Sequence, residues 1–270
     1  MIVHFSAKPH VAIVRKNQRY NPASGRFTLC SPMCQTPFTA IFSKTRETYY
    51  LYPMTWLRSA FQDELDGVTA TLVGLSSLVS DAISKSTHAL LTADLEEAES
   101  VIAADDRVDD IQHELDARII DIIARQQPVA SDLRALVTAL RMSADLERMG
   151  DMAHHIAKIT RLRHPGAAVP SELLLTIEEM GKVARLISDK VGGIINSRDI
   201  DKALEVERDD DEMDKLHRKL FTTLLDPKWP HGIETAIDIT LIGRYYERYA
   251  DHAVSVARRV YFQVTGKFSK

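Results

Sequence analysis

The chain has 270 residues, 45% of them apolar and 27% charged, with few Gly and Pro and a net charge of −4. That composition fits a soluble, helix-rich globular protein large enough for two compact domains. No uninterrupted apolar run approaches the roughly 20 residues that span a bilayer. The only two cysteines, Cys30 and Cys34, exclude a disulfide scaffold and favour a reducing cytoplasm.

Residues 1–53 differ from the rest of the chain. They carry seven Lys or Arg residues and one acid, a net charge of +6, so residues 54–270 carry −10. The segment has no helical or strand period, no apolar stretch of the signal-peptide kind, and too few Lys and Arg for a nucleic-acid-binding arm. We therefore expect a disordered extension, or a misassigned start with the real one at Met54, and no nucleic-acid partner.

From Met54 onward the apolar residues recur at steps of three and four, the period of an amphipathic helix. Asp94 and Asp199 are good N-caps, and Ser131 or Asp132 is expected to cap the third helix. The pattern predicts six helices, over residues 56–92, 95–127, 132–163, 171–197, 199–225 and 232–263.

The six helices fall into two repeats of three. The first repeat covers residues 54–165 and the second covers residues 171–270, with a short linker between them. Long helices with short connections pack as antiparallel neighbours. The predicted fold class is therefore all-α, with two pseudo-symmetric antiparallel three-helix bundles.

One acidic spacing occurs four times in the helices. Two acids four residues apart point in the same direction on a helix. The pairs mirror each other about Pro128 in the first repeat and about residues 230–231 in the second, so four carboxylates should meet at one level in each hairpin. The first cluster is predicted to contain Asp105, Asp109, Glu147 and Asp151, and the second Asp210, Asp214, Glu247 and Asp251.

These two clusters predict two equivalent metal sites. Four clustered carboxylates cannot all stay ionised without a cation between them. In helices 132–163 and 232–263 the acids also continue an apolar stripe, where a charge is costly unless something neutralises it. Carboxylate-only sites suit Mg²⁺, Mn²⁺ or iron, and zinc less well. The alternative is that each acidic pair is ordinary solvated helix surface.

Other charged groups lie near the acids. His113, His154 and His217 are at helical spacing from an aspartate, but none of them repeats in the other half of the chain, so we expect accessory or incidental roles. Arg148 and Arg248 directly follow the two glutamates. They are expected to form ion pairs on the helix surface or to balance the charge of the clusters.

Two stretches of sequence carry a resemblance to a known family. Residues 125–134 (RQQPVASDLR) and 145–153 (DLERMGDMA) closely resemble the first-repeat signature of the PhoU family, and residues 246–253 (YERYADHA) resemble the second. The resemblance covers residues 54–270 and does not extend to residues 1–53. It implies a pair of three-helix bundles, and it implies metal binding by some members through the paired acidic motifs, which here are the eight acids named above.

The resemblance also implies a function. PhoU proteins are accessory regulators of bacterial phosphate-specific transport, so the chain is expected to be a negative regulator of phosphate uptake and of the phosphate-starvation response. Its expected partners are the ATPase subunit of a phosphate ABC transporter and a phosphate sensor histidine kinase. It is expected to be a cytoplasmic homodimer that reaches the membrane only through these partners.

No enzyme is expected, because the sequence has no nucleophile elbow, P-loop or Gly-rich phosphate cradle. One alternative is a carboxylate-bridged metal-binding helical protein without a phosphate role. A ferritin-like di-metal oxidase is disfavoured, because no Glu-xx-His motif occurs and three helices per repeat is the wrong number. Another alternative is a metal-free structural dimer in which the acids only tune electrostatics.

Overall fold

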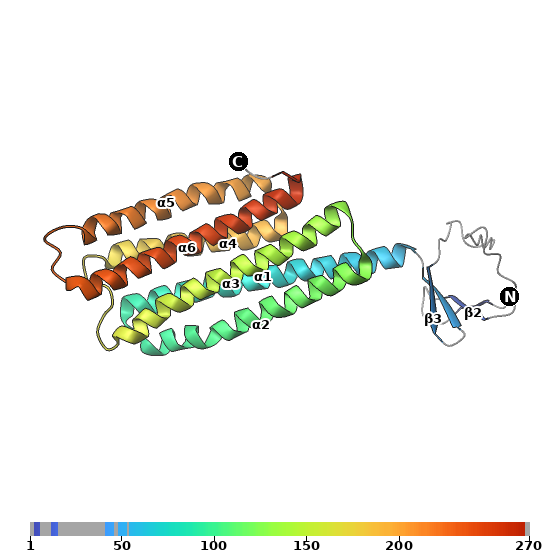
Figure 1. The fold of residues 1–270 in the computed structure, drawn as a ribbon, viewed down its shortest axis with the longest axis horizontal. Coiled ribbons are helices and arrows are strands. Elements are labelled where there is room, and N and C mark those ends of the chain that lie inside the picture. Colours follow the sequence, from blue (N-terminus) through green and yellow to red (C-terminus); the bar gives the residue numbers. More distant parts are fainter. Residues whose placement is uncertain (1–2, 6–11, 16–40, 46–47, 53, 268–270) are drawn as a thin grey trace. The chain divides into compact units, whose positions relative to one another are not determined.

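The computed structural model describes residues 3–5, 12–15, 41–45, 48–52 and 54–267, with side chains from residue 59 onward (Figure 1). Contacts divide the chain into two compact units, Met1–Asp66 and Gly67–Lys270. The second unit contains residues 67–165 of the first repeat and the whole of the second repeat. They therefore form one body with a common core and are not two separate domains.

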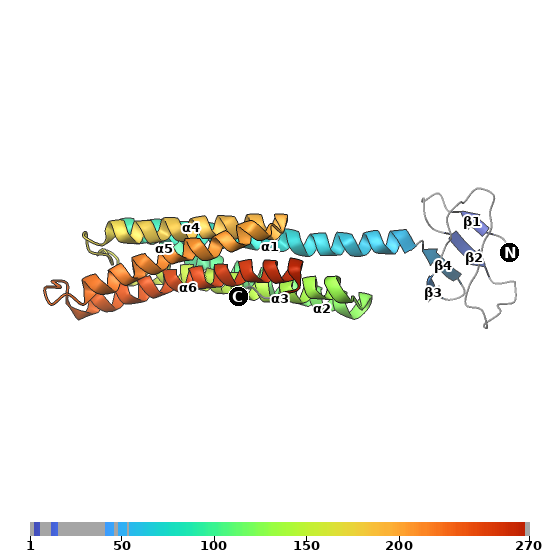
Figure 2. The same cartoon turned by 90° about the horizontal axis from the view of Figure 1, so that it is seen from above.

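The first unit contains a four-stranded antiparallel sheet with the order β1-β2-β4-β3 (Figure 2). Its strands are β1 (Val3–Phe5), β2 (Ala12–Arg15), β3 (Ile41–Thr45) and β4 (Thr48–Tyr52). These strands correct the expectation that residues 1–53 lack regular structure. The β-branched and aromatic side chains of β2 and β4 favour extended backbone, but runs of three to five residues are too short for a period to show. That the native chain starts at Met54 stays a prediction.

Helices with short connections form the described chain from residue 54 to residue 267, and the six predicted helices are confirmed to within about three residues at each end. They are α1 (Met54–Thr92), α2 (Leu95–Gln126), α3 (Ala130–Arg163), α4 (Leu174–Ser197), α5 (Ile200–Leu224) and α6 (Gly232–Thr265). The predicted pair of pseudo-symmetric three-helix bundles is confirmed as well, with α1–α3 in one repeat and α4–α6 in the other.

Two of the helix starts are fixed by the predicted caps. The Asp94 carboxylate accepts a hydrogen bond from the backbone N–H of Glu97 at 3.0 Å. The Asp199 carboxylate accepts from Asp201 at 3.1 Å and from Lys202 at 3.2 Å. Each side chain satisfies backbone donors that the first turn of a helix leaves without an internal partner.

The prediction that Ser131 or Asp132 caps the third helix is wrong. Helix α3 begins two residues earlier than expected, with Val129 as its N-cap and no capping side chain. The chain leaves α2 through Gln127, which has a left-handed φ of 47°, and turns into α3 within three residues. Asp132 therefore lies inside the first turn of α3, where its negative charge interacts favourably with the positive end of the helix dipole.

The two repeats meet along α3 and α6, which lie side by side in the middle of the helices (Figure 1). Helix α1 also crosses to the second repeat. The hydroxyl of Tyr249 on α6 donates to the backbone oxygen of Val79 on α1 at 3.1 Å, and the hydroxyls of Tyr246 and Thr87 lie 2.6 Å apart. Both tyrosines are fully buried. Helix α4 also packs closely against α1, because a Cβ at Gly181 would lie 2.4 Å from Cγ2 of Thr87.

One helix in the described part of the chain, over Ser59–Thr92, is long and apolar enough to cross a membrane by length and composition alone. The core helix of a soluble protein passes the same test. In the second unit this helix buries Leu72, Leu75, Val79 and Ile83 among the other helices.

We expect Asp199→Ala to lower the free energy of unfolding by about 1 kcal/mol, because two backbone donors at the start of α5 lose their acceptor. Urea unfolding followed by far-UV circular dichroism measures this effect. Asp199→Asn is the control, since its side-chain oxygen still accepts both hydrogen bonds. An alanine variant as stable as the wild type would show that the cap contributes nothing.

Candidate functional site

The first carboxylate cluster lies between α2 and α3, as predicted. Asp105 and Asp109 come from α2, Glu147 and Asp151 come from α3, and all four are partly buried. Burial raises the pKa of Asp109, and repulsion from Asp105 and Asp151 raises it further. Burial also raises the pKa of Glu147, as do Asp151 and the two α2 acids. The structure therefore brings all four predicted carboxylates into one interacting group.

The second cluster lies at the corresponding place between α5 and α6. Burial raises the pKa of Asp210 to about 6, and repulsion from Asp251, Asp214 and Glu247 contributes to the shift. Burial and repulsion from Asp251 raise the pKa of Glu247 as well. Asp214 and Asp251 are exposed, so this cluster is more open to solvent than the first.

Guanidinium groups hold several of these carboxylates. The Arg148 side chain lies 3.3 Å from Glu147 and 2.8 Å from Asp151. In the second repeat the ion pair with Glu247 is made by Arg244. The sequence pattern predicts Arg248 as the counterpart of Arg148. That assignment is corrected, because Arg244 lies one turn earlier on α6 and can reach Glu247 at the favourable i,i+3 spacing.

Among the side chains that the structure describes, residues 59–267, no three acidic, histidine or cysteine groups are arranged to hold a metal ion. The donor chemistry nevertheless fits a hard cation, since facing helices supply four carboxylates whose pKa shifts show burial and mutual repulsion. Binding would require Arg148 and Arg244 to release their acids. Metal binding at the eight predicted residues therefore stays a prediction.

The surroundings of the two clusters differ in their histidines. His154 contacts the Asp105 carboxylate through Nδ1, and its Nε2 atom is buried without a hydrogen-bond partner. The second repeat has Val254 at the corresponding position. There His217 of α5 packs against Gly243 of α6, where an added Cβ would lie 3.1 Å from Cδ2 of the ring, and its Nε2 is also buried and unpaired. The two clusters are thus similar in their acids but not in their neighbours.

A buried polar group between the repeats was missed by sequence reasoning. Asp145 of α3 is held by three side chains of α6: Ser255 and Arg259 donate to it at 3.0 Å and 2.6 Å, and Nδ1 of His252 lies 3.1 Å away. Burial alone would raise the pKa of Asp145, but these contacts lower it below its usual value. One signal was available, because Asp145 lies three and four residues from core residues Met142 and Met149, and so on the buried face of α3.

The fold and the site together define a duplicated helical protein in which each three-helix repeat carries a carboxylate cluster. The family model described as the PhoU domain matches residues 72–160 and 177–260. The chain belongs to the PhoU family.

Named relatives agree with this assignment. The chain is 44% identical over 212 residues to "Phosphate-specific transport system accessory protein PhoU homolog 2" of Mycobacterium tuberculosis, covering 78% of this chain and 100% of the relative. A homologue from Rhizobium meliloti with the same role in its name is 31% identical, with 78% and 89% covered. The phosphate transport system regulatory protein PhoU from Streptococcus pneumoniae has a crystal structure that matches with a TM-score of 0.71 and 26% identity, over 78% of this chain and 99% of that chain.

We expect Asp210→Asn to raise the melting temperature of the metal-free protein at pH 7. The native pKa of about 6 lies above the usual 3.8, so the native state holds its proton more tightly than the unfolded state does. Ionised Asp210 therefore destabilises the fold above pH 6, and this penalty disappears as the pH falls towards 3.8.

The gain from Asp210→Asn should accordingly shrink between pH 7 and pH 4, as thermal unfolding at a series of pH values will show. Glu179→Gln is the control, since Glu179 is an exposed acid on α4. Equal behaviour of the two variants would contradict the repulsion in the second cluster.

Proposed function

We propose that this protein is an accessory regulator of a phosphate-specific transport system. The family match over both repeats, together with relatives named as accessory proteins of such a system, carries the proposal. The proposed activity is negative regulation: the protein damps phosphate uptake and the phosphate-starvation response when phosphate is plentiful.

The proposed mode of action is that of an adaptor and not of an enzyme. Its partners would be the ATPase subunit of a phosphate ABC transporter and a phosphate sensor histidine kinase. The described helices support this role, because the two repeats share one buried core and present long polar faces outward. A body of this kind can hold two partners at fixed positions, provided that they use different faces.

We propose a cytoplasmic location, which follows from the proposed partners. The protein would reach the membrane only through them. A homodimer is proposed as the working form, and the mass of the protein in solution tests it.

Metal binding is proposed at the two carboxylate clusters. A bound hard cation would supply positive charge between helices whose facing carboxylates repel one another. The residues that would hold it are Asp105, Asp109, Glu147 and Asp151 in the first repeat, and Asp210, Asp214, Glu247 and Asp251 in the second. The same acids now rely on Arg148 and Arg244 for part of that charge. If a cation replaced these two arginines as the partner of the acids, each cluster would present different groups to solvent.

We expect the double variant Glu147→Ala and Asp151→Ala to lose metal at the first cluster and to keep it at the second, because the repeats hold separate carboxylates. Elemental analysis and titration with Mn²⁺ measure the number of ions bound. The matched control is Asp106→Ala with Asp110→Ala, which removes two exposed acids at the same spacing from α2. Unchanged stoichiometry in the first double variant would show that the ligands are wrongly assigned.

We expect cells that lack the protein to express phosphate-starvation genes even in rich phosphate. A phosphate-responsive reporter in a deletion strain measures this response, and return of the full chain should restore repression. Normal repression in the deletion strain, with no related copy elsewhere in the genome, would remove the regulatory proposal.

A further inference from the structure

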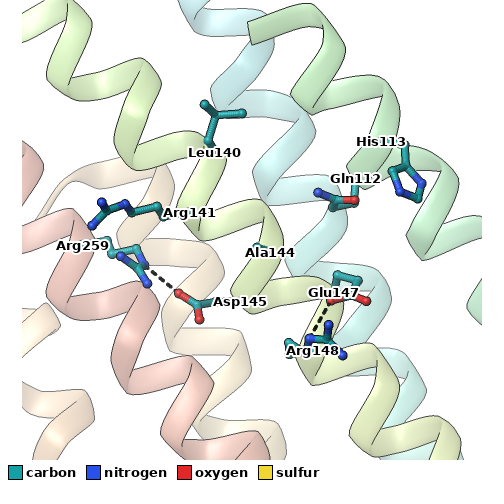
Figure 3. A pocket seen from close by; sticks show the side chains of 9 residues that line it. All are labelled: Gln112, His113, Leu140, Arg141, Ala144, Asp145, Glu147, Arg148 and Arg259. Atoms are coloured by element: carbon teal, nitrogen blue, oxygen red, sulfur yellow. Dashed lines mark hydrogen bonds and ion pairs between the residues drawn. The ribbon is translucent and has the colours of Figure 1, made fainter. Parts of the chain in front are cut away.

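An open depression of 530 Å³ lies on the surface where α2, α3 and α6 meet (Figure 3). The side chains that line it come from two sites described above and from residues with no role so far. They are Gln112, His113, Leu140, Arg141, Ala144, Asp145, Glu147, Arg148 and Arg259. Three of the nine are arginines.

Positive charge prevails in this depression. Asp145 is one of its two acids, and that carboxylate is already held by Ser255, His252 and Arg259. The other acid, Glu147, is paired with Arg148. Arg141 has no ion-pair or hydrogen-bond partner among the described residues, so its charge faces the depression without compensation.

The shape of the depression leaves room for a small ligand beside these charges. Figure 3 shows Arg141 and Arg259 on one side and Gln112 and His113 on the other, with the short side chain of Ala144 between them. Because Ala144 is exposed and ends at Cβ, the floor of the depression is open to solvent.

The residues that line the depression are not repeated at the corresponding positions of the other half of the chain. Glu147 corresponds to Glu247, which places Leu241 where Arg141 would be and Tyr245 where Asp145 would be. Arg259 likewise corresponds to Ile159. The duplicated fold therefore supplies an internal comparison: the corresponding helices are present in both repeats, but Arg141 and Arg259 have no arginine at the corresponding positions.

We propose that this depression binds the phosphate group of a small soluble ligand, either free orthophosphate or a phosphate monoester. A guanidinium group presents paired N–H donors that match two phosphate oxygens, and charge-assisted pairs of this kind are strong and directional. Arg141 and Arg259 would contact the ligand directly. The proposed regulatory role does not depend on this site, nor the site on that role, because binding is measured on the purified protein and regulation by the reporter.

The test is isothermal titration of the full chain with orthophosphate, glycerol phosphate, sulfate and acetate, after metal has been removed by a chelator and the chelator by gel filtration. We expect one phosphate-type ligand per chain, weaker binding of acetate, and weaker binding of all anions at high ionic strength. Preference for orthophosphate or for the ester identifies the source of the phosphate group. Absence of binding by both would overturn the proposal.

Two variants test the depression in different ways. Arg141→Ala removes the uncompensated charge, and Ala144→Leu fills the floor without changing any charge. Each should weaken phosphate binding by about tenfold or more. Both positions are exposed on α3, so circular dichroism should show an unchanged fold.

The matched controls are Arg161→Ala and Ala124→Leu, which make the same changes at exposed helix positions outside the depression. Binding should survive in both controls. If the controls lose as much affinity as the two variants, or if the variants bind like the wild type, the ligand lies elsewhere and the proposal is wrong.

Discussion

The fold depends on one constraint. The faces that join the two repeats bury polar groups, and each of these groups needs a hydrogen-bond or ion-pair partner from the other repeat. Unpaired polar groups at such positions would cost more than most apolar contacts return. Tyr246 meets Thr87, Tyr249 meets the backbone of Val79, and Asp145 meets α6. These contacts fix the register of α1 and α3 against α6. They make the six helices one body, and the positions of both carboxylate clusters follow from that register.

The pseudo-symmetry of the fold is clear in its helices and broken in its polar contacts. Where α3 places Asp145 against an arginine of α6, the equivalent residue of α6, Tyr245, stacks on His155 of α3 with ring centroids 5.1 Å apart. At the far end, Arg163 of α3 binds Asp238 of α6 at 2.5 Å. A duplicated backbone thus presents two different surfaces, which suits a protein proposed to hold two different partners.

Sequence reasoning found the features that depend on local spacing. Helical periods, the Asp94 and Asp199 caps and the mirrored acids all follow from residues close together in the chain, so one sequence sufficed. It missed what depends on approach between distant helices, as at Asp145, whose three partners lie more than a hundred residues away. It named Arg248 and did not consider Arg244, because spacing alone does not show which arginine side chain points towards the glutamate. The strands of the first unit were too short for a period to be recognised.

The two carboxylate clusters destabilise the metal-free fold. Burial and repulsion raise the pKa of Asp109, Glu147 and Asp210, so keeping these groups charged costs free energy at neutral pH. The guanidinium of Arg148 offsets only part of that cost, because it is largely exposed and screened by solvent. The metal binding proposed above would account for acids that weaken the fold in both repeats at matching positions. A cation would have to compete with protons for them, so its affinity should fall as the pH drops towards 6, the native pKa of Asp210.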